Sequence, residues 1–129
     1  MQFHKSLKPH EGCLIHDQDD FQFFLPHEGQ DFAFNGYLPK ENNELRKKIR
    51  SLELYAKGTG QTQIFMEAPY RNQKIMGILT AVCEGNTYLC IAQNITGENE
   101  YIKTKSIATW KSEKKKLDDT PCLFLLNKI

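Results

Sequence analysis

Changes in the spacing of hydrophobic residues divide residues 31–129 into short segments of two kinds. Segments in which hydrophobic and polar residues alternate, or in which hydrophobic residues run without interruption for a few positions, are typical of β-strands. Two continuous runs, Thr87–Gln93 and Pro121–Leu126, are bounded by turn residues and indicate strands covered on both faces. The predicted strands are Asp31–Leu38, Thr62–Met66, Thr87–Gln93, Tyr101–Lys105 and Pro121–Leu126.

Spacing of three and four residues predicts helices between these strands. In Glu41–Lys57 the hydrophobic positions recur at helical spacing, and Gly58 follows where a helix C-cap favours glycine. Pro69 opens a second predicted helix that ends near Cys83, because proline's missing N–H costs nothing in a first turn. Ser106 is placed to cap a short third helix. The alternation predicts an α/β fold, a mixed sheet of about five strands with helices packed on it.

Residues 1–30 differ from the rest of the chain. They contain all four histidines and show no sustained helical or strand period outside the apolar cluster at 21–25. We expect a leader that is poorly ordered or drapes over the next domain, followed by one folded domain over 31–129. The HxxCxxH spacing in residues 10–16 does not match the common paired zinc motifs, so we predict no metal site.

The composition narrows the class of protein. Of 129 residues, 40% are hydrophobic and 26% are charged, as in a single globular domain with a core of its own. The formal net charge of +1 gives no overall bias toward nucleic acid, so such binding requires local basic patches. No run of about 18 apolar residues occurs, so we expect no membrane span. The four cysteines form no CxxC pair, which indicates reduced, buried thiols and a cytoplasmic protein.

Candidate chemistry gathers where the central strand Thr62–Met66 ends. Residues 67–71, EAPYR, follow this strand, and in α/β proteins ligands bind beyond the carboxyl ends of such strands. Residues 94–96 and 120–122 would meet them there, the second group only if its strand runs antiparallel. Backbone groups and small side chains at such an edge can hold an adenine by main-chain hydrogen bonds.

Familiar catalytic motifs are absent from the chain. It contains no GxGxxG, Walker, GxSxG or HExxH pattern, and no histidine follows His27. Glu67 has no partner carboxylate that the sequence places nearby. The residues therefore predict a domain that positions a ligand rather than one that activates a nucleophile, and we assign no catalytic residue.

Two motifs nonetheless resemble those of a known family. Residues 31–39, DFAFNGYLP, contain the pattern F-x-G-[FY]-L-P, and residues 62–71, TQIFMEAPYR, resemble T-x-I-F-[YF]-E-[AST]-P-[HY]-R. With residues 89–97 and the strand Pro121–Leu126, they make residues 31–129 similar to the C-terminal domain of the tetrapyrrole (corrin/porphyrin) methylase superfamily. Within it, they resemble the branch that 2′-O-methylates a cytidine ribose of bacterial 16S ribosomal RNA.

This resemblance implies a methyltransferase that binds S-adenosylmethionine in a cleft between two domains. It also implies a homodimer and small-subunit ribosomal RNA as the partner. Arg71 would bind an RNA phosphate or pair with Glu67, because a guanidinium grips either group through two hydrogen bonds. The implied cofactor-binding residues are Glu67, Ala68, Ile95, Pro121 and Cys122. The implied substrate-binding residues are Asn35, Tyr37, Pro39, Tyr70 and Arg71.

The chain also departs from the family pattern. The family's N-terminal domain carries a glycine-rich G-x-P-x-x-x-D-P-G type of stretch, and residues 1–30 contain nothing like it. We therefore expect about half of an enzyme, with weak S-adenosylmethionine binding and no methyl transfer by itself. Two alternatives stay open. One is a non-catalytic dimerisation or RNA-docking module, favoured by basic residues in 46–50 and 114–116. The other is a tetrapyrrole methylase fragment, disfavoured by EAPYR.

Overall fold

A computed structural model describes residues 32–95 and 97–127, so the predicted leader and its histidines lie outside the described residues. Among the residues described, no helix has the length and apolar character that a membrane span requires. The elements in chain order are β1 (Phe32–Tyr37), α3 (Asn42–Thr59), β2 (Thr62–Met66), the 3₁₀ turn η2 (Pro69–Arg71), α4 (Asn72–Val82), β3 (Tyr88–Gln93), β4 (Tyr101–Ser106), α5 (Ile107–Glu113) and β5 (Cys122–Asn127).

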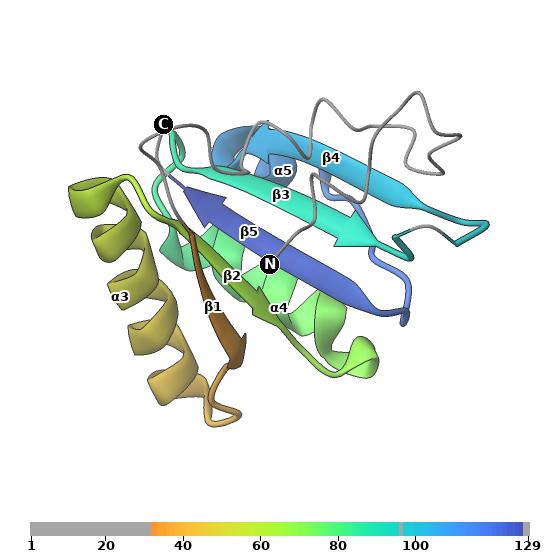
Figure 1. Cartoon of the computed structure of the whole chain (residues 1–129), viewed down its shortest axis with the longest axis horizontal. Helices are drawn as coiled ribbons and strands as arrows, with labels where there is room; N and C mark the ends of the chain where they lie inside the picture. Colours follow the sequence, from red (N-terminus) through yellow and green to blue (C-terminus); the bar gives the residue numbers. More distant parts are fainter. Residues whose placement is uncertain (1–31, 96, 128–129) are drawn as a thin grey trace.

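The strands form one mixed sheet in the order β1-β2-β5-β3-β4 (Figure 1). β1 and β2 are parallel, whereas β5 runs antiparallel to both β2 and β3, and β4 runs antiparallel to β3. The carboxyl ends of β1, β2 and β3 therefore lie at the same edge as the starts of β4 and β5. The predicted fold class, an α/β fold with a mixed sheet of five strands, is confirmed.

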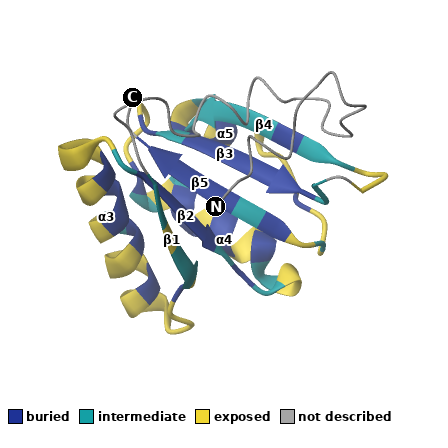
Figure 2. Ribbon diagram, in the orientation of Figure 1, coloured by how far each residue is buried: buried dark blue, intermediate teal, exposed yellow. Residues whose placement is uncertain are grey.

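The helices share one face of the sheet. A single hydrophobic cluster joins residues of α3, α4 and α5 to alternate residues of the strands, including Phe65 of β2 and Phe124 of β5. These two rings stack with their centroids 5.4 Å apart. Trp110 of α5 is only 1% exposed in the same cluster. Figure 2 shows this core as buried residues along the inner sides of the helices and through the central strands.

The opposite face of the sheet has a smaller hydrophobic cluster of its own. Its buried members are Ile64, Cys90, Ala92, Ile102 and Leu125, all of which lie on strands. Successive side chains of a strand point to opposite faces, so the continuous apolar runs of β3 and β5 supply both clusters at once. This is the double-faced burial that their sequences predict.

The ends of the first two helices differ from the prediction. α3 begins after Glu41, whose side chain accepts hydrogen bonds from two backbone N–H groups of the first turn. It ends at Gly60, which has a φ of 76° and donates its N–H to Ala56 O at 2.8 Å. The predicted C-cap at Gly58 is therefore wrong, since Gly58 lies inside the last turn. The predicted helix from Pro69 is divided into the 3₁₀ turn η2 and α4.

Candidate functional site

A pocket lies at the edge where β2 and β3 end and β5 begins. It has a volume of about 660 Å³, which is within the usual range for small-molecule sites. β5 runs antiparallel to β2 and β3, so its first residues lie at this edge. This is the strand direction under which residues 120–122 were predicted to reach the site. Met66, Ala92 and Leu123 line the pocket from these three strands. Ala92 and Leu123 belong to the sheet face opposite the helices, so the pocket opens on that side of the edge.

A tight turn after β3 forms one wall of the pocket. Asn94 has a φ of 51°, a left-handed conformation that asparagine tolerates better than most residues. Its carbonyl accepts a hydrogen bond from Gly97 N at 2.8 Å, and its side-chain amide donates to Asn99 O at 3.4 Å. The chain therefore folds back on itself, and Ile95 lines the pocket.

The adjoining wall is the loop before β5, whose Pro121 O accepts a hydrogen bond from Asn94 N at 3.2 Å, and two buried amides hold this loop. Gln93 Nε2 donates to Thr120 Oγ1 at 3.0 Å and to Asp118 O at 3.1 Å. Asn72 Nδ2 donates to Thr120 O at 2.7 Å and to Asp118 O at 3.0 Å. Sequence reasoning missed both amides. The sequence did contain a signal for each amide. Gln93 is a polar residue at the end of an apolar run, and Asn72 is a polar residue at the start of α4, and both positions can reach a neighbouring loop.

The five residues implied to bind the cofactor divide into two groups. Ile95, Pro121 and Cys122 line the pocket together. Glu67 and Ala68 do not line it. The side chain of Glu67 is 2% exposed, and its Oε1 accepts a hydrogen bond from Ala68 N at 2.8 Å. The structure thus brings together the predicted residues on β3 and β5, while those after β2 turn toward the body of the domain.

Arg71 pairs with Glu67, one of the two roles expected of it. Arg71 Nε lies 3.2 Å from Glu67 Oε2, and its side chain is 11% exposed. The two groups are not aligned as a hydrogen bond, so the contact is an ion pair. Arg71 Nη2 also donates weakly to Lys40 O at 3.5 Å. The guanidinium therefore ties the segment after β2 to the segment before α3.

The other residues implied to bind substrate differ in accessibility. Asn35 is engaged within the sheet, since its Nδ2 donates to Gln63 Oε1 at 3.1 Å beside a register shift in β1. Tyr37, at the carboxyl end of β1, is 65% exposed, and Tyr70, in the turn η2 that follows β2, is 70% exposed. Pro39 is exposed as well. The two tyrosines and the proline are thus open to a ligand, and their contact with substrate stays a prediction.

The thiols of the described residues are structural. Cys83, Cys90 and Cys122 are buried and unpaired in disulfides. Burial, with a smaller contribution from Cys90, raises the pKa of the Cys122 thiol above its usual range. A neutral thiol is a poor nucleophile, so Cys122 contributes shape to the pocket rather than reactivity. Within residues 32–95 and 97–127, no group of His, Cys, Asp and Glu could hold a metal ion.

No family model matches the chain, and neither does any curated protein. Solved structures do resemble it. The methyltransferase CobJ has a TM-score of 0.51 at 18% identity over 78% of this chain and 42% of CobJ. The uroporphyrin-III C-methyl transferase from Thermus thermophilus complexed with S-adenosyl homocysteine has a TM-score of 0.49 at 14% identity, over 85% of this chain and 49% of that one. The native form of that transferase has a TM-score of 0.48 at 15% identity, over 81% of this chain and 45% of that one.

The chain thus spans less than half the length of these structures. The five-stranded mixed sheet with helices on one face is the fold of part of the methyltransferase CobJ.

Proposed function

We propose that this chain forms one wall of an S-adenosylmethionine site in a methyltransferase. Its substrate would be a cytidine ribose of small-subunit ribosomal RNA, methylated at the 2′-hydroxyl. The observation that carries the proposal is the pocket shared by Ile95, Pro121 and Cys122, at the strand edge where the motif resemblance places the cofactor. The shared fold with the methyltransferase CobJ supports it.

The residues of the pocket fit such a cofactor. Ala92 and Leu123 offer an apolar floor for a flat ring. The turn after β3 and the loop before β5 border this floor, and backbone groups in such segments can recognise an adenine by its edge. When bound, S-adenosylmethionine supplies an activated methyl group on a sulfonium. The chain's own contribution is to orient and desolvate, since we assign it no general base.

The choice of RNA over a tetrapyrrole rests on the EAPYR segment and on its surroundings. Tyr37 and Tyr70 are exposed aromatic side chains near this edge, and exposed aromatic rings can stack on unpaired bases. A tetrapyrrole substrate and a non-catalytic dimer are the alternatives. The expected assembly is a homodimer in the cytoplasm.

Calorimetric titration of the full chain with S-adenosylmethionine tests the cofactor proposal. A cofactor bound at micromolar affinity corresponds to about 8 kcal/mol. If a second wall normally supplies two or three further hydrogen bonds, each worth about 1–1.5 kcal/mol, the chain binds on the order of a hundred- to a thousandfold more weakly. We expect a dissociation constant near the millimolar range and no methyl transfer to RNA.

A matched pair of variants locates the binding. Ile95→Trp places a large ring against the pocket and should abolish the weak heat of binding. Leu54→Trp makes a comparable change on α3, where the side chain is 52% exposed, and should leave binding unchanged. Low-micromolar binding by the unmodified chain would contradict the single-wall proposal. Equal binding by both variants would place the cofactor elsewhere.

A further inference from the structure

A second surface, here called the lysine groove, lies between α4 and α5. It has a volume of about 270 Å³. Its α4 side carries uncharged residues, among them the small Gly77 and Thr80. Its other side carries four lysines, on α5 and just after it. They are Lys111, Lys114, Lys115 and Lys116.

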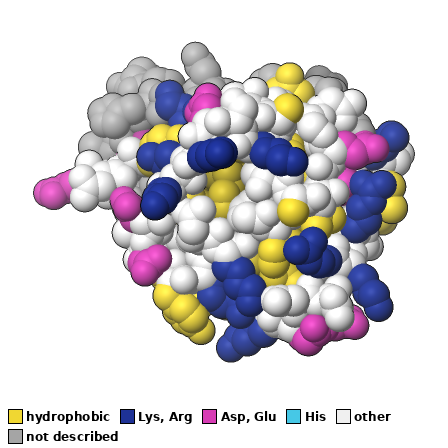
Figure 3. All heavy atoms as spheres, turned by 180° about the vertical axis from the view of Figure 1, so that it is seen from behind, with side chains coloured by type: hydrophobic (Ala, Val, Ile, Leu, Met, Phe, Trp, Pro, Cys, Tyr) yellow, Lys and Arg dark blue, Asp and Glu magenta, His cyan; other side chains and the backbone are white. Residues whose placement is uncertain are grey.

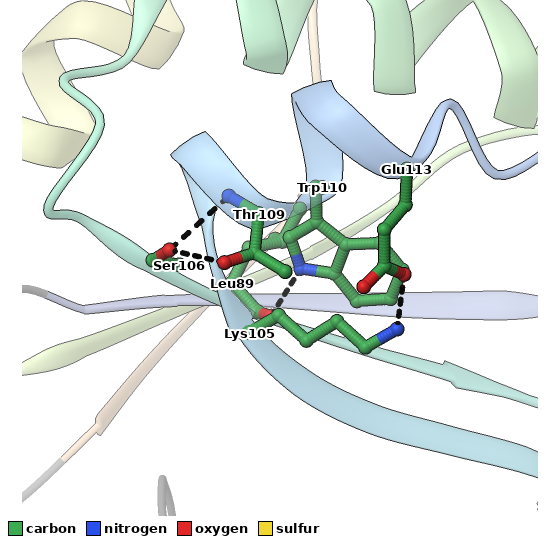
Figure 4. A network of polar contacts seen from close by, with 6 residues as sticks. All are labelled: Leu89, Lys105, Ser106, Thr109, Trp110 and Glu113. Carbon is green, nitrogen blue, oxygen red and sulfur yellow. Dashed lines mark hydrogen bonds and ion pairs between the residues drawn. The ribbon is translucent and has the colours of Figure 1, made fainter.

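The positive charge of this groove is not neutralised. All four lysines are exposed, and within the described part of the chain none has a carboxylate within ion-pair distance. Glu113 is committed to Lys105, whose Nζ lies 2.6 Å from Glu113 Oε1 (Figure 4). In Figure 3, which views the molecule from the helical side, Lys and Arg side chains spread across the face while acidic ones lie mostly toward its margin. The groove therefore presents an excess of cations.

The helix α5, which carries Lys111 and leads into Lys114–Lys116, is anchored to the sheet. Trp110 Nε1 donates to Leu89 O at 2.9 Å from a fully buried position (Figure 4). Ser106 caps α5 by accepting a hydrogen bond from Thr109 N at 3.2 Å. Lys105 Nζ lies 4.7 Å from the centre of the Trp110 ring. A wall that is fixed before a ligand arrives loses less entropy on binding.

One loop connects the lysine groove to the pocket. It begins with Lys114–Lys116, which line the groove, and reaches Thr120 and Pro121, which line the pocket. Leu117 N donates to the Gln73 side chain at 2.7 Å, which fixes the middle of the loop to the start of α4. Lys116 and Thr120 are four positions apart in the chain, so their Cα atoms are at most about 14 Å apart. A strand lying in the groove can therefore extend to the pocket edge.

We propose that the lysine groove binds the phosphate backbone of the RNA whose target ribose lies at the pocket. The identification of the polyanion as RNA rests on the proposed function. Clustered lysines bind phosphates with an affinity that comes from the release of condensed counterions. They do not read sequence, because the phosphate backbone is the same at every nucleotide. The groove would thus hold the RNA beside the pocket and leave the choice of nucleotide to other contacts.

The salt dependence of binding to a 12-nucleotide single-stranded RNA tests this proposal. Four phosphate contacts give a slope of about −3 for log K against log salt, so raising the salt from 50 to 200 mM should weaken binding roughly fiftyfold. Lys111, Lys114, Lys115 and Lys116 are changed together to Gln. We expect this variant to lose at least tenfold in affinity at 50 mM salt and most of the slope.

A comparison variant with the same loss of charge uses α3, whose basic residues 46–48 are the other candidates for RNA docking in the sequence. Arg46, Lys47, Lys48 and Lys57 are exposed there and are changed together to Gln. This variant should keep the slope and lose less than threefold in affinity. Circular dichroism checks that both variants fold, and the S-adenosylmethionine titration is repeated on each.

Several outcomes overturn the proposal. Equal losses in the two variants would mean that RNA binding follows overall charge rather than the groove. Undetectable binding of the unmodified chain at 50 mM salt would exclude RNA as the ligand. If the variant without the four groove lysines lost binding to polyglutamate but kept its binding to RNA, the groove would be assigned to an acidic protein. A failed RNA assay with the expected weak cofactor binding would refute the groove and leave the cofactor proposal standing.

Discussion

The ion pair between Glu67 and Arg71 determines how the segment after β2 is built, and replacing Arg71 with Met tests its role. Met keeps much of the length of the side chain but removes its charge. The Glu67 carboxylate, 2% exposed, would then keep one hydrogen bond among the described residues, from Ala68 N. A buried charge that loses its partner destabilises the folded state strongly. We expect Arg71→Met to lower the free energy of unfolding by about 3 kcal/mol.

The magnitude follows from the distance between the two groups. Unit charges 3.2 Å apart attract each other by roughly 5 kcal/mol at an effective dielectric constant of about 20. Desolvation offsets part of that attraction, and breaking a buried pair by removing one partner typically costs about 3–5 kcal/mol. The imperfect alignment of Arg71 Nε with Glu67 Oε2 places the expected value at the lower end.

Urea unfolding of the unmodified chain, Arg71→Met, Glu67→Gln and the double variant measures the coupling directly. Gln at position 67 retains an oxygen that can accept from Ala68 N, so that variant removes the charge and little else. The double variant should be less destabilised than the two single changes predict together, by about 2 kcal/mol. Tyr70→Ser is the control, because that side chain is 70% exposed and should change stability by less than about 0.5 kcal/mol.

A loss below about 1 kcal/mol in Arg71→Met, with no coupling in the cycle, would refute this reasoning. The arginine would then contribute little to the fold. It would be available to a phosphate, the other role that its motif implies. The same four variants, titrated with RNA, would show whether that role is used.

Two further predictions concern the helix end and a buried thiol. Gly60→Ala should destabilise the protein by about 1 kcal/mol in thermal unfolding, because its φ of 76° strains any side chain. Gly58→Ala should instead stabilise it by up to about 1 kcal/mol, because Gly58 lies inside α3 with open space around it. If Gly58→Ala were the destabilising variant and Gly60→Ala the stabilising one, Gly58 would be the helix cap after all. Burial raises the pKa of Cys83 to about 12. The folded state therefore holds this proton after the unfolded chain loses it near pH 9, and stability should fall by about 1 kcal/mol between pH 8 and 10. In Cys83→Ala, stability should fall less between pH 8 and 10 by this amount. If the variant and the unmodified chain showed the same dependence of stability on pH, this prediction would be wrong.

The sequence predicts the elements well because their burial is two-sided or strictly periodic. The apolar runs of β3 and β5 and the helical spacing of α3 each leave few alternatives. The direction of β5 was not predictable in the same way. Strand direction depends on connections and pairing across the whole sheet, so the sequence could state only the condition under which residues 120–122 reach the site.

The errors and omissions concern short-range geometry. Gly58 and Gly60 are both suitable helix caps by composition, and the choice depends on which carbonyl the terminal N–H reaches, here Ala56 O. Asn72 and Gln93 look like ordinary polar residues at the ends of apolar segments. Their hydrogen bonds to the 118–120 loop join residues that are 25 to 48 positions apart. No local pattern encodes contacts of that range.

The direction of β5 decides what this chain can offer to a binding partner. Because β5 runs antiparallel to β2 and β3, the loop that precedes it reaches the edge where those strands end. That loop carries Lys114–Lys116 at one end and Thr120 and Pro121 at the other. A parallel β5 would place Asn127 at the pocket and move the lysines to the far edge of the sheet. One reversal of strand direction therefore joins a basic groove on the helical face to an apolar pocket on the other, which is the arrangement that the proposed binding of RNA beside a small cofactor requires.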